Sequence, residues 1–405
     1  MQSVDYLIIG GGIAGTAAAE TIRAHDVSSS IAILEREPHP LYSRVLIPHY
    51  LKKKIERERL FLRTTSDYEK QRISFYPDTI MAGCDIERRE VTALLGGSVD
   101  GSKEIFSYKK LLLATGGAPN PLSASLSFGD EAPMFRMQTI ADADTIIDAI
   151  LKAPTHEAAV LGEGFIAMEF IEAFFINGFR VHVLCRGGFF GEKKLGIRGA
   201  QLLEEIYQKH GIRFYKNIRD EEIARRNAWL SEHNKPFQIS VVGVGIGITR
   251  GLNMFRALTI NRGVVTNEYS QTSNTDVYAA GDIAEWYDSI KGRHTVVGNW
   301  TNAFLQGRVA ALNMLGQKTS LRVVPTYNII NFGVNLTFVG DVDGGDDVLE
   351  EIGTVVYPFL RRVIFQNNKT IGGVLINRFS DKTLLASLVE AGASRDDVEK
   401  TFQSI

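Results

Sequence analysis

Residues 6–20 read YLIIGGGIAGTAAAE. The apolar run at residues 6–9 predicts a strand, and the small residues after Gly15 predict a helix lying close against it. In such a turn Gly10 permits the tight bend, Gly12 lets a pyrophosphate approach the backbone, and Gly15 allows helix and strand to pack closely. The phosphates then lie on unpaired N–H groups at the positive end of the helix dipole. This stretch therefore predicts a dinucleotide site.

A carboxylate completes this first unit. Residues 31–35 read IAILE and predict the second strand, so Glu35 stands at its end, 20 residues after Gly15. A carboxylate in that place accepts hydrogen bonds from both hydroxyls of a ribose. Strand, turn, helix, strand and acid all agree, which disfavours the interpretation as a glycine-rich turn without a ligand.

A second turn begins 152 residues after Gly10, where residues 158–167 read AAVLGEGFIA. Gly162 and Gly164 take the first two glycine positions, and Ala167 replaces the third glycine, an accepted variant. The strand predicted at residues 181–184 is followed by Cys185 and Arg186 instead of an acid. Nothing there repels a 2′-phosphate, and an arginine is able to bind one. Two interpretations stay open: a nicotinamide nucleotide site tolerant of NADPH, or an Arg186 that is only a solvated turn residue.

Composition narrows the class of protein. A chain of 405 residues is too long for a single hydrophobic core and has a length typical of two or three domains. The net charge of −2 provides no basic surface for nucleic acid, so no nucleic-acid partner is expected. No apolar run reaches the ~18 residues of a membrane span, and no basic segment precedes the apolar N-terminus as a signal peptide requires. We therefore expect a cytoplasmic protein without a membrane span.

Cysteine and histidine spacing excludes two kinds of site. The two cysteines, Cys84 and Cys185, lie 101 residues apart, which excludes a C-x-x-C pair and argues against a disulfide framework. The eight histidines show no metal-ligand spacing, so no metal site is expected. Both cysteines are interpreted as packing residues.

Residues 272–282 read TSNTDVYAAGD and form the most specific motif in the chain. With the two turns, this motif resembles the FAD-dependent pyridine nucleotide-disulfide oxidoreductase superfamily. Within it, the chain is most similar to rubredoxin reductases, the flavin modules of assimilatory nitrite reductases, and ferredoxin reductases of the oxygenase type. The likeness covers nearly the whole chain and includes YSR at residues 42–44, ATG at residues 114–116, and NWxxAxxQGR at residues 299–308. It implies an α/β fold with two Rossmann-like dinucleotide-binding domains and a C-terminal α+β domain.

The resemblance also implies the cofactors, FAD at the first turn and NADH or NADPH at the second. Asp282 is expected to bond a ribityl hydroxyl of FAD. The helix after Trp300 is expected to point its N-terminus at the flavin pyrimidine, where its dipole would raise the flavin potential. The expected FAD residues are Gly10, Gly12, Ile13, Ala14, Gly15, Glu35, Arg36, Arg44, Met81, Ala114, Thr115, Gly116, Gly281, Asp282, Trp300 and Ala303. The expected NAD(P) residues are Gly162, Gly164, Phe165, Ile166, Ala167, Glu169, Cys185, Arg186 and Gly245.

One position departs from the family pattern. Family members often carry a lysine shortly after the Tyr-x-Arg segment, paired near flavin N5 with a glutamate on the helix of the second turn. The glutamate matches Glu169, and the lysine position is assigned to His49. Two interpretations stay open: a catalytic pair in which Glu169 draws the His49 imidazole toward its charged form, or a histidine packed at a domain seam.

Missing thiols limit where electrons can go. No C-x-x-C follows the first helix, and no cysteine stands at residues 42–51, where some members of the superfamily place a single redox thiol. Electrons are then expected to leave the flavin directly. The preferred acceptor is a small redox protein such as rubredoxin or ferredoxin. An NAD(P)H oxidase reducing oxygen or a small molecule, and a catalytically impaired FAD-binding regulatory protein, are the alternatives.

Domain boundaries and partner contacts complete the expectations. We expect a FAD domain at residues 1–117 and 243–320, a NAD(P) domain at 118–242, and a C-terminal interface domain at 321–405, in a monomer or a homodimer. Residues 51–60 alternate in charge as a solvated helix would. The cations in this stretch could instead steer an acidic carrier; they are Lys52, Lys53, Lys54, Arg57 and Arg59. Residues 219–238 are expected to form a solvent-facing connection.

Overall fold

The structure is a computed structural model that describes residues 1–97, 101–122, 132–218, 231–232, 235–236 and 238–403. The chain divides into two compact units. Unit 1 consists of Met1–Val45, Arg57–Ala118 and Thr249–Val323, and unit 2 of Leu46–Glu56, Pro119–Ile248 and Val324–Ile405. The segments expected to form the NAD(P) and C-terminal domains thus fall in one unit, and the division into three domains stays a prediction.

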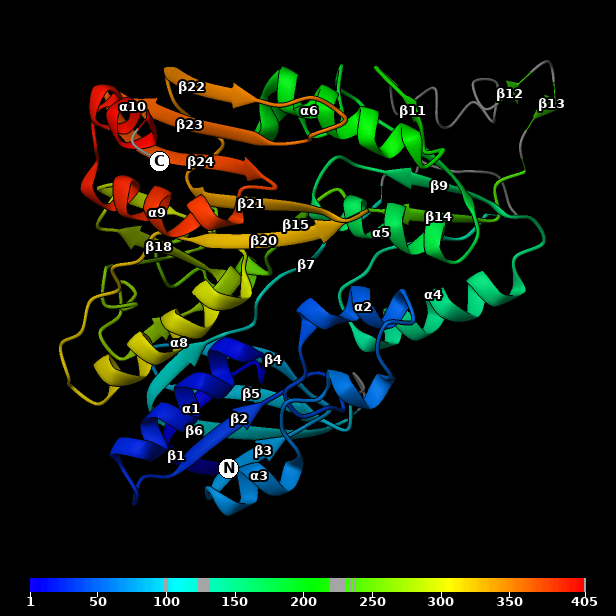
Figure 1. Cartoon of the computed structure of the whole chain (residues 1–405). Coiled ribbons are helices and arrows are strands. Elements are labelled where there is room, and N and C mark those ends of the chain that lie inside the picture. Colours follow the sequence, from blue (N-terminus) through cyan, green and yellow to red (C-terminus); the bar gives the residue numbers. More distant parts are fainter. Residues whose placement is uncertain (98–100, 123–131, 219–230, 233–234, 237, 404–405) are drawn as a thin grey trace. The chain divides into compact units, whose positions relative to one another are not determined.

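Unit 1 is built on a seven-stranded sheet whose parallel part has the order β3-β2-β1-β6, with β17 also on β6 (Figure 1). Ile8 lies opposite Ile33 of β2 and Leu112 of β6, and all three side chains are fully buried. Burial on both faces explains why these strands read as continuous apolar runs. The parallel strands are β1 (Gln2–Ile9), β2 (Ile31–Leu34), β3 (Ile73–Tyr76), β6 (Ser102–Leu113) and β17 (Val277–Ala279); β4 (Thr79–Asp85) and β5 (Glu90–Leu95) extend the sheet antiparallel.

Helices α1 (Ile13–His25) and α8 (Trp300–Met314) pack against each other in unit 1. The contact is closest at Gly307, where an added Cβ would lie 2.1 Å from the Ala14 carbonyl oxygen. Small residues on both helices therefore allow this close approach. The remaining elements are α3 (Thr65–Lys70), the 3-10 helices η1 (Arg44–Leu46), η2 (Arg57–Leu60), η3 (Leu252–Phe255) and η4 (Gly281–Ile283), and the sheet of β16 (Val264–Thr266), β18 (Ala284–Asp288) and β19 (Arg293–Thr295).

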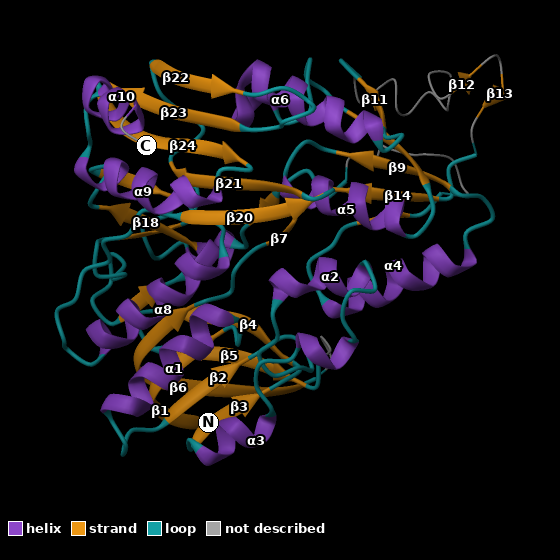
Figure 2. Cartoon of the chain, viewed as in Figure 1, coloured by secondary structure: helices purple, strands orange, loops and turns teal. Residues whose placement is uncertain are grey.

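Unit 2 contains a second parallel sheet, of order β11-β10-β9-β14-β8 (Figure 2). Its central strands are buried throughout their apolar runs, which is the pattern of a parallel sheet covered on both faces. The strands are β8 (Met134–Phe135), β9 (Glu157–Leu161), β10 (Arg180–Leu184), β11 (Arg213–Tyr215) and β14 (Val241–Val244). The helices are α2 (Ile47–Leu51), α4 (Ile140–Lys152), α5 (Phe165–Ile176) and α6 (Glu192–Lys209).

Unit 2 also contains an antiparallel sheet of order β20-β21-β24-β23-β22. Its elements are β20 (Thr326–Asn331), β21 (Val334–Gly340), β22 (Asp347–Ile352), β23 (Leu360–Gln366) and β24 (Lys369–Ile376), followed by η5 (Phe379–Asp381), α9 (Lys382–Ala391) and α10 (Arg395–Gln403). Helix α6 bends at Gly196, whose φ is 71° and whose added Cβ would lie 2.3 Å from Arg362 Nη1 of β23. Two parallel sheets that each carry a glycine turn, and an α+β C-terminal part, confirm the predicted fold class.

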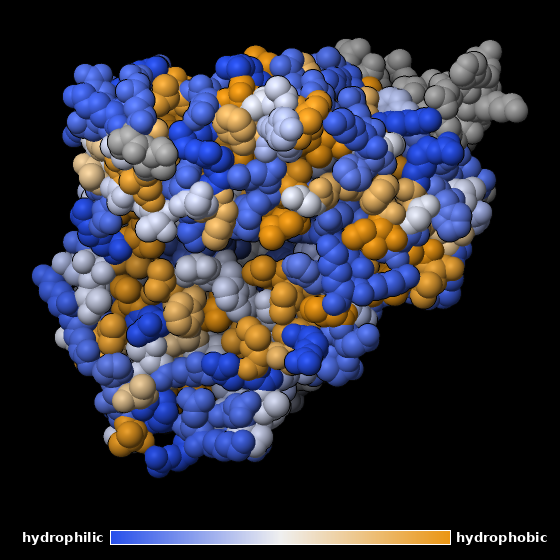
Figure 3. Space-filling model, in the orientation of Figure 1, coloured by the Kyte–Doolittle hydropathy of each residue, from blue (hydrophilic) through white to orange (hydrophobic). Residues whose placement is uncertain are grey.

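Short strands fill the remaining connections. They are β7 (Ala118–Pro119), β15 (Ile248–Thr249) and the antiparallel pair β12 (Ser231–Glu232) and β13 (Lys235–Pro236). The solvent-facing connection expected at residues 219–238 lies mostly outside the described residues. Of the helices that the structure describes, none combines the length and the apolar character needed to span a bilayer. The face shown in Figure 3 interleaves hydrophobic and hydrophilic residues.

The prediction for residues 51–60 is wrong. Helix α2 ends at Leu51, and a separate 3-10 helix begins at Arg57. Leu51 and Lys52 are buried, with exposed fractions of 0% and 3%. The charge alternation suggested a solvated helix, but tertiary packing of α2 against α4 and α5 takes the first residues of this stretch out of water.

Candidate functional site

The first glycine turn has the geometry that its sequence predicted. Gly10 has φ of 104°, and an added Cβ would lie 2.4 Å from the Ala114 carbonyl oxygen. At Gly15 an added Cβ would lie 1.9 Å from the Gly10 carbonyl oxygen, so a side chain there would open the turn. Gly12 precedes the first residue of α1, and no atom lies within 4 Å of its added Cβ. The N-terminus of α1 is therefore open to a phosphate group.

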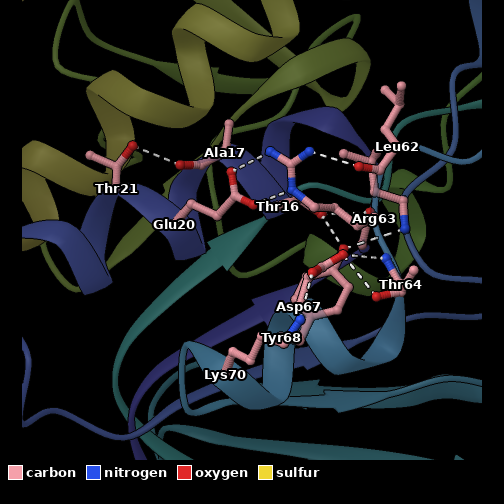
Figure 4. Close-up of polar contacts among 12 residues, drawn as sticks. Thr16, Ala17, Glu20, Thr21, Leu62, Arg63, Thr64, Asp67, Tyr68 and Lys70 are labelled. Atoms are coloured by element: carbon pink, nitrogen blue, oxygen red, sulfur yellow. Dashed lines mark hydrogen bonds and ion pairs between the residues drawn. The ribbon is translucent and has the colours of Figure 1, made fainter.

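Side chains of α3 and of the loop before it form polar contacts with α1, the helix that follows this turn (Figure 4). The Thr16 hydroxyl donates to the Gly11 carbonyl oxygen at 2.9 Å and lies 3.0 Å from the Tyr68 hydroxyl. Arg63 binds both carboxylate oxygens of Glu20 on α1, at 2.6 and 3.1 Å. These contacts hold the first turn of α1 in a fixed place relative to the sheet.

Glu35 lies at the end of β2 beside the turn. Its carboxylate accepts the Gly11 N–H at 2.5 Å and the Glu37 N–H at 2.9 Å. Burial raises the pKa of Glu35, while these two hydrogen bonds lower it, and the net direction is upward. Arg44 binds Glu37 at 2.5 Å and so lies on the same side of the turn, where a small pocket is lined by Gly11, Gly12, Glu35 and Arg44 among others.

This upward shift predicts a pH dependence of FAD binding. A protonated carboxyl accepts fewer hydrogen bonds from a ribose, so affinity is full above the raised pKa of Glu35 and falls as the pH drops through it. We expect the dissociation constant of the apoprotein for FAD to rise about tenfold over that range. Titrations of Glu35→Gln serve as the control and should show a smaller rise, because the side chain at position 35 no longer titrates. An equal rise in both proteins would contradict the role of Glu35.

Asp282 is positioned by the turn after β17. It stands in η4, half-buried, and burial raises the pKa of its carboxyl against the opposing charges of Arg250 and Arg44. Arg250, which the sequence analysis missed, donates through Nε to the Asp282 carbonyl oxygen. Burial lowers the pKa of Arg250. The charges of Asp282 and Glu285 act in the opposite direction and favour the charged guanidinium.

The other expected FAD residues lie on several elements of unit 1. Ala114, Thr115 and Gly116 follow β6, and Gly116 has φ of 66°. Gln306 of α8 accepts the Gly281 N–H at 2.7 Å, and Asn299 caps α8 by accepting the Asn302 N–H at 2.8 Å. The remaining positions are Ile13 and Ala14 in the first turn of α1, Met81 in β4, Trp300 and Ala303 in the first turn of α8, and the exposed Arg36 after β2. The open N-terminus of α1, a carboxylate after β2 and an aspartate after β17 fit FAD.

The second glycine turn, in unit 2, repeats the geometry with one exchange. Gly162 has φ of 114°, and its added Cβ would lie 2.3 Å from the Gly245 carbonyl oxygen. No atom lies within 4 Å of an added Cβ at Gly164. Gly245, which follows β14, faces Ala167 closely, and an added Cβ at Gly245 would lie 2.6 Å from the Ala167 nitrogen. In the first site the residue after the strand is Ala114 and the helix residue is Gly15. In the second site the residue after the strand is Gly245 and the helix residue is Ala167, so alanine and glycine are exchanged between these two positions.

Four of the expected NAD(P) residues differ in their exposure and in the groups that they present. The Phe165 ring packs edge-on against Tyr327 and Phe338, with ring centroids 4.6 and 5.0 Å apart, which leaves its backbone N–H for a nucleotide. Cys185 is fully buried, and burial raises the pKa of its thiol. Arg186 is exposed immediately after it, and Ile166 is partly exposed in α5.

The assignment of His49 to the lysine position is wrong. Lys52 forms the ion pair with Glu169, and it forms a second pair with Glu172 one turn further along α5. The Lys52 side chain is 2% exposed, whereas His49 is exposed. Glu169 does raise the pKa of His49, but partial burial and the two nearby lysines lower it, and the net direction is downward. Of the two interpretations of His49, the shift toward its charged form is not what the net change of its pKa indicates, and a catalytic role for His49 stays a prediction.

Glu172 connects this ion pair to the antiparallel sheet of unit 2. It accepts the Phe332 N–H at 2.9 Å and the Asn331 amide at 3.4 Å. Asn331 in turn accepts the Tyr207 hydroxyl at 2.7 Å and donates to the Met168 carbonyl oxygen at 3.0 Å. We call Lys52, Glu169, Glu172, Asn331 and Tyr207 the lysine network. It joins the end of α2 to α5, α6 and β20 through polar groups that are mostly buried, and of these residues the sequence analysis connected only Glu169 with this pair.

Two glycine turns on parallel sheets, with a carboxylate after β2 and an aspartate after β17 in unit 1, have the geometry expected of a protein that binds two dinucleotides. The model of the pyridine nucleotide-disulphide oxidoreductase family matches residues 4–307. The chain belongs to this family of flavoprotein oxidoreductases, whose cofactors are FAD and NAD(P)H. In the described part of the chain, no group of three or more metal-ligating side chains is placed to hold an ion.

Similar proteins agree with this placement. Apoptosis-inducing factor 3 of Mus musculus is 28% identical over 370 residues, which is 88% of this chain and 59% of that protein. The chain thus spans less than two thirds of that relative. The structure of a covalent putidaredoxin reductase–putidaredoxin complex matches with a TM-score of 0.84 and 22% identity, covering 97% and 94% of the two chains. NADH:rubredoxin oxidoreductase from Clostridium acetobutylicum matches with 0.80 and 23%, covering 98% and 97%. These two likenesses concern the fold.

Proposed function

We propose that the protein transfers a hydride from NAD(P)H, bound at the Gly162 turn, to FAD, bound at the Gly10 turn, and passes the electrons to a small redox protein of the rubredoxin or ferredoxin type. The observation that carries this proposal is the pair of complete turns, each with an open helix N-terminus and a carboxylate beside it. When bound, FAD supplies the chemistry that converts a two-electron hydride donor into single-electron steps.

The chain's own residues have separate tasks in this proposal. The N–H groups at the start of α1 and α5 bind the two pyrophosphates. Glu35 binds the adenosine ribose of FAD, and Asp282 the ribityl chain, with Arg250 and Arg44 offsetting the negative charge. Lys52, in place of His49, is the cation that family members pair with a glutamate near the flavin.

The properties of the two cysteines argue against electron transfer through a thiol. Burial raises the pKa of Cys84 to about 12, and burial also raises that of Cys185. A thiol with a raised pKa is a poor nucleophile and a poor redox partner at neutral pH. The electrons therefore leave the flavin without a disulfide intermediate, as the missing C-x-x-C already suggested.

The choice of a protein acceptor rests on the family branch that the motifs resemble. Relatives named for putidaredoxin and rubredoxin share the fold, and we extend that partner class to this chain. Residues 321–405 are proposed as the platform for the partner or for a second copy of the chain. Lys52 is buried and takes no part in steering a carrier, so any basic docking patch must be formed by other residues.

Reoxidation kinetics test the acceptor. The holoprotein is reduced anaerobically with one equivalent of NADH and then mixed with rubredoxin, with a ferredoxin, or with oxygen. We expect reoxidation by at least one of the iron proteins to be faster than by oxygen, by about 100-fold or more, because electrostatic docking accelerates association. Rapid reoxidation by oxygen alone would instead support the NAD(P)H oxidase. Failure of every acceptor would support the catalytically impaired flavoprotein.

A further inference from the structure

The two dinucleotide turns can be compared atom by atom because their strands end in the same way. Glu35 follows β2 and donates its N–H to the Tyr76 carbonyl oxygen at 2.9 Å. Cys185 follows β10 and donates its N–H to the Tyr215 carbonyl oxygen at 2.8 Å. Glu35 and Cys185 are therefore equivalent, and so are Glu37 and Gly187, two residues further along each chain segment.

A carboxylate occupies the same place in both sites. In unit 1 the Glu37 N–H donates to Glu35 Oε1 at 2.9 Å. In unit 2 the equivalent N–H, that of Gly187, donates to Glu163 Oε1 at 3.0 Å. The acid that is missing from position 185 is thus supplied from elsewhere in the same site.

The source of this second carboxylate is the glycine turn itself. Glu163 is the second residue of its turn, the position that Gly11 takes in the first turn. In unit 1 the carboxylate of Glu35 crosses from the strand to the Gly11 N–H at 2.5 Å. In unit 2 the side chain of Glu163 crosses in the opposite direction, from the turn to the end of the strand.

The surroundings of Glu163 are consistent with this exchange. An added Cβ at Gly187 would lie 3.5 Å from both Glu163 carboxylate oxygens, so the residue after Arg186 leaves room for them. In unit 1 an added Cβ at Gly11 would lie 3.1 Å from Glu35 Oε2, so a side chain at position 11 would be crowded. After burial, the negative charge of Glu163 is the largest cause of the raised pKa of the Cys185 thiol, which places that charge beside the strand end.

We propose that Glu163 binds the adenosine ribose hydroxyls of the nicotinamide nucleotide and makes the site select NADH over NADPH. The inference rests on the proposed function, in which this turn holds NAD(P)H. A carboxylate at the end of the second strand accepts hydrogen bonds from the 2′- and 3′-hydroxyls and repels a 2′-phosphate. The site therefore has its ribose acid, and the absence of an acid at Cys185 does not make it tolerant of NADPH.

Nucleotide binding measured without turnover tests this proposal. Dissociation constants of the FAD-loaded protein for NAD⁺ and NADP⁺ are measured by calorimetry for the wild type, Glu163→Gln, Glu163→Ala and Arg186→Ala. We expect the wild type to prefer NAD⁺, and Glu163→Gln to shift the ratio of the two constants toward NADP⁺ by about 10- to 100-fold. Glutamine still accepts the Gly187 N–H, so a purely structural Glu163 would be replaced by it without a change of ratio.

Other results of these binding measurements would contradict either this inference alone or the proposed function as well. An unchanged ratio in Glu163→Gln would overturn the proposal, as would a wild type that prefers NADP⁺ and loses this preference in Arg186→Ala. In both cases nucleotide binding itself would still support the proposed function. If the folded wild type with full FAD content bound neither nucleotide, the proposed function would fail and this inference with it. An unaltered FAD content in each variant shows that unit 1 is intact.

Discussion

Replacement of Lys52 by methionine is expected to lower the free energy of unfolding by about 3–5 kcal/mol. The Lys52 side chain is 2% exposed between Glu169 and Glu172, whose side chains are 18% and 8% exposed. Removing the cation leaves two carboxylates close together in a poorly hydrated place, and the cost of an uncompensated buried charge exceeds that of the lost ion pair. Denaturant unfolding of the FAD-loaded protein measures the change.

Lys54→Met is the matched control for this variant. The Lys54 Nζ lies 3.9 Å from Glu172 but the side chain is 45% exposed, so we expect a change within about 0.5 kcal/mol. Adding Glu169→Gln and Glu172→Gln to Lys52→Met should recover part of the loss, because the uncompensated charges are then gone. A single Lys52→Met variant as stable as Lys54→Met would show that the two carboxylates do not depend on Lys52.

Replacement of Gly15 by alanine is expected to weaken FAD binding by about 100-fold. The new Cβ would lie 1.9 Å from the Gly10 carbonyl oxygen and 3.0 Å from Ile8 Cγ2, so the turn and α1 must move apart. The N–H groups that bind the pyrophosphate then lose their common direction. The flavin absorbance per protein after purification, and titration of the apoprotein with FAD, both report the loss.

Gly245→Ala separates this effect from general unfolding. Its Cβ would lie 2.6 Å from the Ala167 nitrogen, so it should disturb the second turn in the same way that Gly15→Ala disturbs the first. We expect Gly15→Ala to lose FAD while retaining NAD⁺ binding, and Gly245→Ala to do the reverse. Loss of both nucleotides in either variant would mean that the two turns do not act as separate sites.

Much of this site could be predicted from sequence because its signals are local. A glycine turn needs a positive φ at its first glycine and no bulky side chain where the helix meets the turn, and these requirements leave a recognisable pattern at residues 10–15 and 162–167. Glu35 could be predicted for a similar reason, because it directly follows the next strand of the same unit. The α/β fold and two dinucleotide sites follow from these patterns, whereas the identity of the cofactors as FAD and NAD(P)H came from the resemblance to the family.

The residues that were missed depend on contacts between distant segments. Lys52 reaches Glu169 only because α2 packs against α5, 117 residues further along the chain, so position in the sequence favoured His49 instead. Glu163 occupies a position in the glycine motif that accepts any residue, and its task appears only when the two strand ends are compared. Arg250 lies in irregular backbone just before η3, where no periodic pattern marks a functional side chain.

Anaerobic titration of the FAD-loaded protein with NADH, followed by its flavin absorbance, tests the central claim most directly. Two turns that hold a hydride donor and a flavin predict stoichiometric bleaching of the flavin band, with NADH more effective than NADPH. Bleaching should disappear in Gly245→Ala and persist in Lys54→Met. A flavin band that neither nucleotide bleaches, in a protein that retains FAD, would contradict the assignment of this chain as an NAD(P)H-dependent flavoprotein oxidoreductase.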